Sequence, residues 1–352
     1  MRNSKILHII PDLGPGGAQK YLSKLVSEDN ENIHLIYVIN PEKYIEKDLK
    51  NVEIIFSKKN LIFFPFMHIL ELNFLIKKIK PNVVNSWLYH ADFLSIFINP
   101  FYKCKKIWCI RNAVNDMSFL KKKTRIIIKL CSFFSKIIPN LIIYNSESGR
   151  RSHESINYCK SKSYVIENGV DVNFQEQEKR VLNKEIYRIG TACRNDPAKG
   201  LNFLIEALNH LDFNDWHWTA VGEGIPELNV NLDPSKFELI GHIDDIYSFY
   251  NNIDLFVLPS ISEGFSNVLL ESMAQGIDCI ATNVGDNLKI VGPNNFIVPS
   301  RNPLEIKKAI SKKYDLWIRK KRHSYNIKNA IYVADNFGFK KSFMLFQNAW
   351  KH

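Results

Sequence analysis

The hydrophobic positions of this chain form short, β-branched runs that alternate with longer amphipathic segments. Such alternation predicts parallel sheets whose strands are connected by helices. In the first half the predicted strands are Ile6–Ile10, His34–Ile39, Val52–Phe56, Val83–Ser86, Ile107–Ile110, Leu141–Tyr144 and Tyr164–Ile166. In the second half they are Tyr187–Thr191, Trp218–Val221, Phe237–Ile240, Leu255–Leu258 and Cys279–Ala281. The pattern therefore predicts an α/β fold.

A polar, charged segment without apolar periodicity, residues 175–184, separates the two halves and is interpreted as a linker. Because 352 residues suffice for two domains, we expect Rossmann-like, doubly wound domains over residues 1–175 and 185–325. They are expected to face an interdomain cleft, since open α/β sheets bind ligands at the carboxyl ends of their strands. Residues 326–352 are expected to form a C-terminal helix that packs back on the first domain.

The net charge of +11 lies entirely in the first half of the chain. Residues 1–175 hold 26 Lys and Arg against 15 Asp and Glu, whereas the remainder holds 21 of each kind. A basic half attracts nucleic acid, a phosphorylated substrate or an acidic membrane surface. Lysine-rich, solvated faces would give the same balance without any partner.

Basic and bulky apolar residues are interleaved at helical spacing over residues 119–138. The basic positions are Lys121, Lys122, Lys123, Arg125, Lys129 and Lys136. The apolar positions are Phe119, Leu120, Ile126, Ile127, Ile128, Leu130, Phe133, Phe134, Ile137 and Ile138. This pattern is typical of a helix at a lipid interface, although a core helix with a charged outer face would also show it.

No stretch has the length and apolarity of a membrane-spanning helix, since Pro65, His68, Glu71 and Asn73 interrupt the most apolar one. No signal-peptide pattern is visible near Met1. The six cysteines lack metal-ligand spacing and suit a reducing compartment. We therefore expect a cytoplasmic protein, peripheral on the inner face of the cytoplasmic membrane.

The segment from Pro259 to Glu271, PSISEGFSNVLLE, follows a buried strand and enters a helix near Ser266. Backbone N–H groups at such a helix start can bind phosphate. Glu263 lies before the helix and Glu271 inside it, so both can reach one ligand. Taken alone, Glu271 would be read as a solvated helix residue.

A second loop, from Gly190 to Gly200, follows another predicted strand and carries Arg194 and Lys199. Two cations at a strand's carboxyl end can hold a pyrophosphate and neutralise it as it leaves. Outside this setting, the same two residues would more often be plain surface charge.

With these motifs the chain resembles the retaining nucleotide-sugar transferases of glycosyltransferase family 4, which have the GT-B architecture. The resemblance implies that Glu271 binds the donor ribose and that Glu263 lies near the transferred sugar. It also implies that Arg194 and Lys199 hold the diphosphate. The backbone of Gly264, Phe265 and Ser266 would lie against the diphosphate and sugar.

Weaker matches and departures accompany this signature. Val221–Gly224, Ile240–His242 and Ala281–Asp286 resemble family turns at strand ends. Cys193 stands where Gly usually precedes the arginine, and Asp278 where relatives commonly have Pro. The Gly often found shortly before the position of Phe296 is absent. These departures affect the expected loop geometry and leave the charged residues in place.

The first half carries further matches. Gly16 and Gly17 belong to a Gly-rich loop after the first strand, and the resemblance implies close backbone approach to the donor there. His90 resembles a histidine directed towards the reacting sugar, although a single histidine is usually structural. Arg111 and Asn112, after the strand Ile107–Ile110, would face the acceptor.

The expected activity is therefore the retaining transfer of a sugar from a nucleotide-diphosphate donor, a UDP-sugar. The acceptor would be a glycan or a polyprenyl-diphosphate-linked glycan of bacterial surface polysaccharide (capsule, O-antigen or lipopolysaccharide) synthesis. No cofactor is expected and no metal is required, since the cations and the helix dipole replace it. Alternatives are a UDP-sugar 2-epimerase of the same architecture and a nucleic-acid-binding protein, although no nucleic-acid-binding motif is visible.

Overall fold

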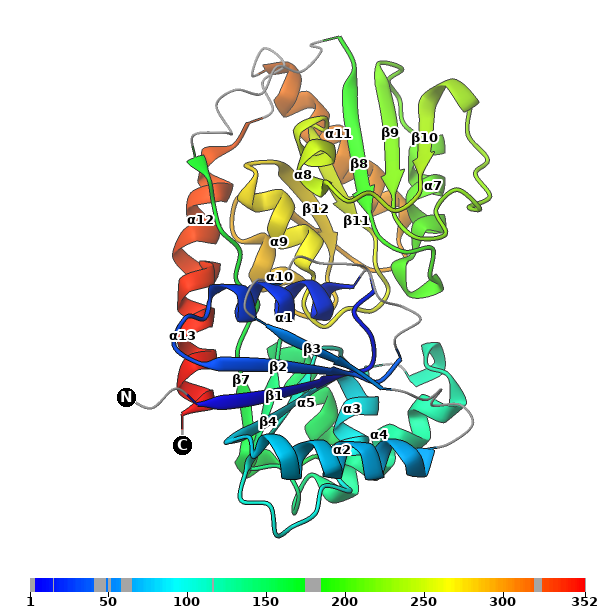
Figure 1. Cartoon of the computed structure of the whole chain (residues 1–352). Coiled ribbons are helices and arrows are strands. Elements are labelled where there is room, and N and C mark those ends of the chain that lie inside the picture. The colour runs from blue at the N-terminus through cyan, green and yellow to red at the C-terminus, as the bar shows by residue number, and fades with distance from the viewer. Residues whose placement is uncertain are drawn as a thin grey trace. The chain divides into compact units, whose positions relative to one another are not determined.

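A computed structural model describes residues 4–14, 16–40, 49, 52–57, 65–115, 117–174, 185–319 and 325–351 of the chain. The chain divides into two compact units. The first comprises Met1–Asn168 and Ser342–His352, and the second Gly169–Lys341. Each unit is a parallel sheet with helices on both faces (Figure 1). The expected linker over residues 175–184 lies outside the described residues.

Among its described residues, the first unit has a seven-stranded parallel sheet in the order β3-β2-β1-β4-β5-β6-β7. Its strands are β1 (Lys5–Ile10), β2 (Ile33–Val38), β3 (Glu53–Phe56), β4 (Val83–Trp87), β5 (Lys105–Ile110), β6 (Leu141–Tyr144) and β7 (Ser163–Val165). The central strands β1, β2 and β4 are almost continuously buried and mostly apolar, as expected for a sheet covered on both faces.

Helices cover both faces of this sheet, α1 and α13 on one side and α2 to α5 on the other (Figure 1). Their bounds are α1 (Gly17–Glu28), α2 (Pro65–Ile79), α3 (Leu88–Ser95), α4 (Lys122–Phe134), α5 (Glu147–Ser155) and α13 (Phe339–Trp350). Two 3-10 turns, η2 (Met117–Phe119) and η3 (Lys160–Lys162), complete the unit.

The described part of the second unit has a six-stranded parallel sheet in the order β10-β9-β8-β11-β12-β13. Its strands are β8 (Tyr187–Ala192), β9 (Trp216–Val221), β10 (Phe237–Ile240), β11 (Leu255–Leu258), β12 (Asp278–Thr282) and β13 (Phe296–Val298). Its helices and turns are η4 (Pro197–Lys199), α7 (Leu201–Asn209), η5 (Pro234–Lys236), α8 (Ile246–Asn251), α9 (Asn267–Ala274), α10 (Asn287–Val291), α11 (Pro303–Arg319) and α12 (Ile327–Phe337). Apolar cores lie on both faces, α8, α9 and α12 covering one and α7 and α11 the other.

These sheets confirm the expected α/β class with two Rossmann-like units. Each predicted strand is present, with ends shifted by at most two residues. Strand β13 was not predicted from the sequence, because only three apolar residues, Phe296–Val298, separate two turn-rich segments. None of the described helices combines the length and the apolarity needed to cross a bilayer.

The expected single C-terminal helix is wrong, because the tail forms two helices separated at Gly338. There Val170 donates its backbone N–H to Phe337 O at 3.0 Å and accepts from Phe339 N at 3.1 Å. This parallel bridge replaces helical hydrogen bonds at the break. A Cβ on the neighbouring Gly169 would lie 2.5 Å from Phe339 Cα, so only glycine allows the two segments to approach this closely.

The α13 helix anchors in the first unit through Trp350, which is 1% exposed. Its indole Nε1 donates to Asn85 Oδ1 at 2.9 Å, and its ring contacts His8 and His34 edge-on. The two histidines are joined by a 2.9 Å hydrogen bond, and His34 Nε2 lies 3.0 Å from Asp29 Oδ2. Residues from both ends of the sequence therefore share one buried polar cluster.

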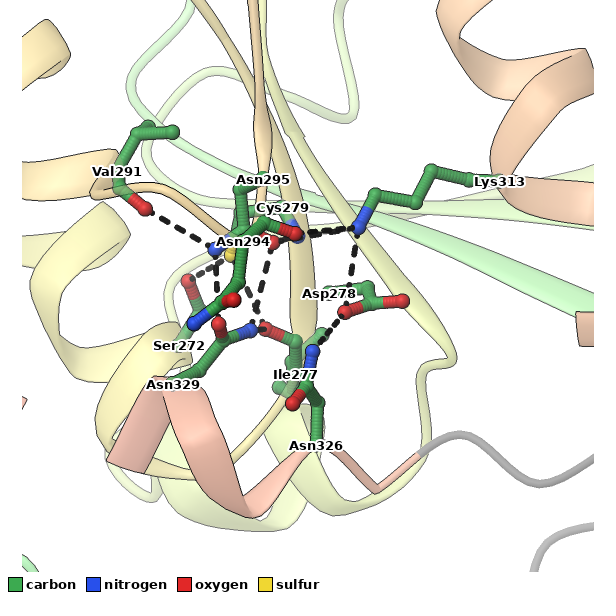
Figure 2. Close-up of polar contacts among 10 residues, drawn as sticks. All are labelled: Ser272, Ile277, Asp278, Cys279, Val291, Asn294, Asn295, Lys313, Asn326 and Asn329. Carbon is green, nitrogen blue, oxygen red and sulfur yellow. Dashed lines mark hydrogen bonds and ion pairs between the residues drawn. The ribbon is translucent and has the colours of Figure 1, made fainter. Parts of the chain in front are cut away.

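In the second unit, Asp278 takes part in a buried polar network that ties β12 to α11 and α12 (Figure 2). Its Oδ1 lies 3.3 Å from Nζ of Lys313, whose residue is 3% exposed, and accepts from Asn326 Nδ2 at 2.8 Å. Lys313 also donates to Asn294 O at 3.2 Å, and Asn329 donates to Ile277 O at 2.7 Å. The departure from proline at this position thus supplies the carboxylate for a buried lysine.

Candidate active site

Two loops of the second unit meet beyond the carboxyl ends of the adjacent strands β8 and β11. The carbonyl of Ala198, in the first loop, accepts from Ile261 N at 2.7 Å and from Ser262 N at 3.2 Å. These hydrogen bonds join the Arg194–Lys199 segment to the segment that begins at Pro259. The two motifs of the sequence analysis are therefore parts of one arrangement.

The side chains of Lys199 and Glu263 form an ion pair across this junction, with Nζ and Oε1 2.6 Å apart. Ser260 Oγ donates to the same carboxylate oxygen at 2.7 Å. Burial alone would lower the pKa of Lys199, but the charge and hydrogen bond of Glu263 outweigh it and raise that pKa above its ordinary value. The lysine is therefore fully charged at neutral pH.

Backbone geometry fixes the turn that carries Lys199. Asp196 Oδ1 accepts from Ala198 N at 2.8 Å and caps the 3-10 turn, and Gly200 then adopts a φ of +63°. A Cβ at Gly200 would lie 2.4 Å from Pro259 O, so the glycine allows the loops to touch. Arg194, earlier in this loop, is exposed and makes no side-chain hydrogen bond or ion pair with the described residues.

The α9 helix begins at Asn267 with Ser266 as its N-cap, and the Ser266 side chain makes no capping hydrogen bond. Gly264, Phe265 and Ser266 are buried directly before it. Gly285, with a φ of +57°, packs against this segment, since a Cβ there would lie 2.6 Å from Glu263 O and 2.7 Å from Gly264 O. The backbone N–H groups at a helix start are suited to bind an anionic group.

Glu271 lies on α9, on the same segment as Glu263, and contacts Tyr250 of α8. The Tyr250 hydroxyl lies 3.1 Å from Glu271 Oε2 and 3.1 Å from Val268 O, so its single proton is shared between two acceptors. Tyr250 is fully buried, which fixes the position of its hydroxyl. The role of Tyr250 was not predicted from the sequence, because a tyrosine shortly before a strand carries no signal of such a contact.

A third loop, Val221–Gly224, packs against the loop that carries Arg194 and Lys199. Gly222 has a φ of +142°, and a Cβ there would lie 1.9 Å from Cys193 O. Asn195 N donates to Glu223 O at 2.9 Å. Burial raises the pKa of the Cys193 thiol to about 12, so this cysteine stays protonated and is unsuited to act as a nucleophile.

In the first unit, the predicted glycine loop leads into α1. Gly16 is the N-cap and Gly17 the first helical residue. Asp12 Oδ1 accepts from Gly14 N at 3.1 Å and from Gln19 Nε2 at 2.9 Å, which fixes both sides of the loop. The N-cap itself is a glycine, so it offers no side chain to cap the helix.

His90 is the third residue of α3 and is exposed. Leu88, at the junction of β4 and α3, has a φ of +70°, which is unusual for a non-glycine residue. Such strain costs on the order of 1–3 kcal/mol and is often found at functional sites. The backbone turn at Leu88 sets the direction in which α3 leaves the strand. It therefore also sets the position of His90, two residues later.

Arg111 is 7% exposed, and its guanidinium lies 5.0 Å from the Tyr21 ring centroid and 5.4 Å from that of Trp87. It also donates through Nη2 to Asn168 Oδ1. Its neighbour Asn112 is exposed. The two residues expected to face the acceptor therefore have different environments in this conformation, one interior and one on the surface.

Of the predicted residues, the structure joins Lys199, Glu263 and the start of α9, and places Arg194 on the same loop. Glu271 follows on α9 and has its own buried partner, Tyr250. Gly16, Gly17, His90, Arg111 and Asn112 belong to the first unit. Within the described residues, no group of three or more His, Cys, Asp and Glu side chains is placed to hold a metal ion.

Comparison with known proteins places these features in context. A family model described as "Glycosyl transferases group 1" matches residues 184–315. The chain is 24% identical over 338 residues to the capsular polysaccharide biosynthesis glycosyltransferase CapM of Staphylococcus aureus, covering 89% of this chain and 88% of that one. It is also 24% identical over 262 residues to an Escherichia coli UDP-Gal:alpha-D-GlcNAc-diphosphoundecaprenol alpha-1,3-galactosyltransferase, covering 68% and 65% of the two chains.

Among solved structures, Anabaena HepE in complex with UDP and glucose matches with a TM-score of 0.80. The match covers 99% of both chains at 15% sequence identity. At this identity the likeness concerns the fold, and it confirms the GT-B architecture expected from the sequence.

Proposed function

We propose that this chain, which is a glycosyltransferase with the GT-B fold similar to family 4, transfers a sugar from a UDP-sugar to a lipid-linked glycan. The observation that carries the proposal is the Lys199–Glu263 ion pair on the segment that leads into the start of α9. A cation and backbone N–H groups adjoining one another suit a diphosphate, and a carboxylate beside them suits a sugar hydroxyl.

In the proposed reaction, the bond between the anomeric carbon and the diphosphate oxygen breaks, and a bond to the acceptor oxygen forms on the same face. The acceptor's proton passes to the departing phosphate oxygen. Lys199, Arg194 and the start of α9 stabilise the charge that develops on the diphosphate. Glu263 orients the sugar, His90 faces it, and Gly16 and Gly17 approach the donor.

Ribose binding is assigned to Glu271. A carboxylate can accept both ribose hydroxyl groups, and the hydrogen bond from Tyr250 restricts its rotation. Gly264, Phe265 and Ser266 would then face the diphosphate and the sugar through their backbone. No metal is assigned a role in this scheme.

The acceptor and the biological role are proposed from two sources. CapM is named for capsular polysaccharide biosynthesis, and the E. coli relative for transfer to a diphosphoundecaprenol-linked sugar. The basic, apolar helix α4 suits a protein that works at a membrane surface. We therefore infer a role in surface polysaccharide synthesis on the cytoplasmic face of the membrane, with Asn112 and Arg111 on the acceptor side.

The donor assignment is tested by thermal shift with UDP-, GDP- and ADP-sugars on the wild type and on Glu271→Ala. We expect UDP-sugars to stabilise the wild type most, and the variant to lose most of that stabilisation. Equal stabilisation of both proteins by every nucleotide would contradict the ribose contact.

The reaction itself is tested by incubating the protein with a UDP-sugar and a polyprenyl-diphosphate-linked sugar. The expected product is a lengthened lipid-linked glycan in which the new bond keeps the donor's anomeric configuration. Conversion of the donor to its 2-epimer without an acceptor would support the epimerase alternative instead.

The exposed side chains of α4 support the proposed membrane contact. Ile126, Leu130, Phe133 and Ile137 are exposed between 39% and 69% and repeat at helical spacing. Lys121, Lys122 and Lys123 are exposed at the start of the helix. Replacing these three lysines with Glu is expected to weaken liposome binding, and unchanged binding would refute this contact. Arg125 is better left intact, because it hydrogen-bonds to the carbonyls of Leu120 and Ser118.

A further inference from the structure

A second group of large apolar side chains is exposed on the first unit, away from α4. Phe66, Leu70 and Phe74 of α2 are 78%, 64% and 71% exposed and repeat every four residues along one side of the helix. Phe97 and Phe101, in the loop after α3, are 43% and 87% exposed. Large apolar residues that gather on one surface mark an interaction site more often than isolated ones do.

Hydrogen bonds hold the two elements of this group together. Asn73 on α2 donates through Nδ2 to Phe97 O at 3.0 Å, and its Oδ1 accepts from Asn99 N at 2.8 Å. The ring of Phe97 also packs edge-on against Phe93 of α3, with centroids 5.3 Å apart. The loop is thus fixed beside α2, so that the five exposed side chains form one surface, which we call the α2 patch (Phe66, Leu70, Phe74, Phe97, Phe101).

Within residues 65–106 the exposed charged side chains are all basic, whereas Glu53 of β3 is also exposed and lines a hollow with Lys78. Lys77, Lys78, Lys80 and Lys103 are exposed. Over residues 65–106, all of which are described, the acidic residues are Glu71 and Asp92, and neither is exposed. Glu71 accepts from Tyr37 and Ser57, and Asp92 from Ser86. Basic charge beside aromatic side chains complements an anionic lipid surface.

The α2 patch and the exposed stripe of α4 belong to the same helical layer. The α3 helix packs with α2 in one apolar core and with α4 in the next, so α2, α3 and α4 lie side by side on one face of the sheet (Figure 1). The outward sides of α2 and α4 therefore face away from the same sheet. An extended layer of this kind fits a bilayer surface better than it fits a single peptide.

We propose that the α2 patch inserts into an anionic bilayer and forms, with α4, one membrane-binding face of the first unit. This inference rests on the proposed function, in which the acceptor is lipid-linked. The phenylalanine and leucine side chains supply apolar contact with the acyl chains, and the surrounding lysines contact the lipid phosphates. Two separate contacts on one layer fix the orientation of the first unit on the membrane, which α4 alone would leave free to rotate.

The test measures binding of the whole protein to vesicles of phosphatidylcholine with and without phosphatidylglycerol. Phe74→Ser/Phe101→Ser is compared with Leu304→Ser/Ile331→Ser, a matched pair of exposed apolar residues on the second unit. We expect the first variant to bind anionic vesicles at least tenfold more weakly and the control to bind like the wild type. Equal binding of the first variant and the wild type would overturn the proposal, even if the α4 lysine variant lost binding.

Depth of insertion gives a second, independent measurement. In Phe101→Trp, vesicles with brominated acyl chains should quench more tryptophan fluorescence than in the wild type, and no added quenching would overturn the proposal.

If the α2 patch instead joins two copies of the chain, sedimentation of the wild type would show a dimer that Phe74→Ser/Phe101→Ser abolishes without loss of vesicle binding. Transfer to a water-soluble acceptor analogue should persist in this variant, whereas loss of transfer in every protein tested would count against the proposed function.

Discussion

Lys199 Nζ and Glu263 Oε1 lie 2.6 Å apart, although 64 residues separate them in the sequence. Each comes from a loop that follows its own strand, and the Ala198 carbonyl joins the two loops. Their side chains are 22% and 10% exposed, so the pair is partly accessible. The pair therefore provides two opposite charges held together before any donor binds.

The first prediction concerns this pair. Glu263→Gln keeps the size of the side chain and an acceptor for Ser260, but removes the charge that faces Lys199. We expect turnover to fall on the order of a hundredfold, as when one preorganised electrostatic group is removed. Lys199→Met should lower turnover by a similar factor. In steady-state kinetics, the fold-loss of turnover in the double variant should be smaller than the product of the two single fold-losses. Fully multiplicative losses would mean that the two residues act independently.

The second prediction concerns Tyr250, which we expect to position Glu271. Tyr250→Phe removes one hydrogen bond, worth about 1 kcal/mol, so affinity for UDP should fall roughly fivefold with little change in kcat. Isothermal titration with UDP and with a UDP analogue lacking the ribose hydroxyls measures the effect. The variant and the wild type should bind the analogue equally, and an equal loss for both ligands would indicate a general structural effect.

The third prediction concerns Gly285, whose φ of +57° and contact with Glu263 O exclude a Cβ. Gly285→Ala should lower the free energy of unfolding by about 2 kcal/mol or more, because it adds both backbone strain and a steric clash. Gly241→Ala is the matched control, since its Cβ would meet only Pro226 Cγ at 3.8 Å. Urea denaturation of the two variants checks this, and equal destabilisation would contradict the assigned contact.

The fourth prediction concerns the buried ion pair between Asp278 and Lys313. Asp278→Ala leaves the lysine charge buried without its carboxylate and should cost about 3 kcal/mol of stability. Adding Lys313→Met should recover most of that loss, because the double variant no longer contains a buried charge. Chemical denaturation of the single and double variants tests the coupling, and additive losses would argue against it.

The fifth prediction concerns His153, which is fully buried. Its Nδ1 donates to Gly149 O at 2.7 Å and its Nε2 accepts from Tyr89, so the ring is neutral. Burial lowers the pKa of His153 from 6.5 to about 4. The folded state therefore binds this proton less readily than the unfolded state, and the resulting stability is present above pH 6.5 and is lost as the pH falls towards 4.

The lower pKa of His153 in the folded state should reduce the free energy of unfolding by about 2 kcal/mol when the pH falls from 7 to 5. Urea midpoints of the wild type should fall over this range, and His153→Gln should show a smaller decrease. His8 titrates in the same sense and remains in the variant, so part of the decrease persists. The exposed His210→Gln is the control and should behave like the wild type. An unchanged slope in His153→Gln would contradict the assignment.

Much of the fold was predictable because many buried strands are short runs of mostly apolar residues. Leu255–Leu258 is wholly buried, and its apolar pattern marks it clearly. Phe296–Val298 lacks such a signal, since three residues are too few to show a period. The break at Gly338 depends on pairing with Val170, a contact between distant positions that local propensity does not encode.

The part of the candidate site that was predicted from the sequence consists of charged residues in loops that follow strands. Arg194, Lys199 and Glu263 could be singled out because each lies in a loop directly after an apolar run. The partner of Glu271 could not, because Tyr250 comes from another helix and its role depends on packing. The burial of Arg111 between two aromatic rings likewise arises from tertiary contacts of α1 and β4.

The placement of α13 has a consequence for how the protein is made. The second unit is one uninterrupted stretch, Gly169–Lys341, so it can complete its sheet on the ribosome while residues 342–352 are still being added. The first unit contains residues from both ends, and Trp350 covers His8 and His34. The nascent first unit therefore lacks this cover over His8 and His34 until α13 has been synthesised.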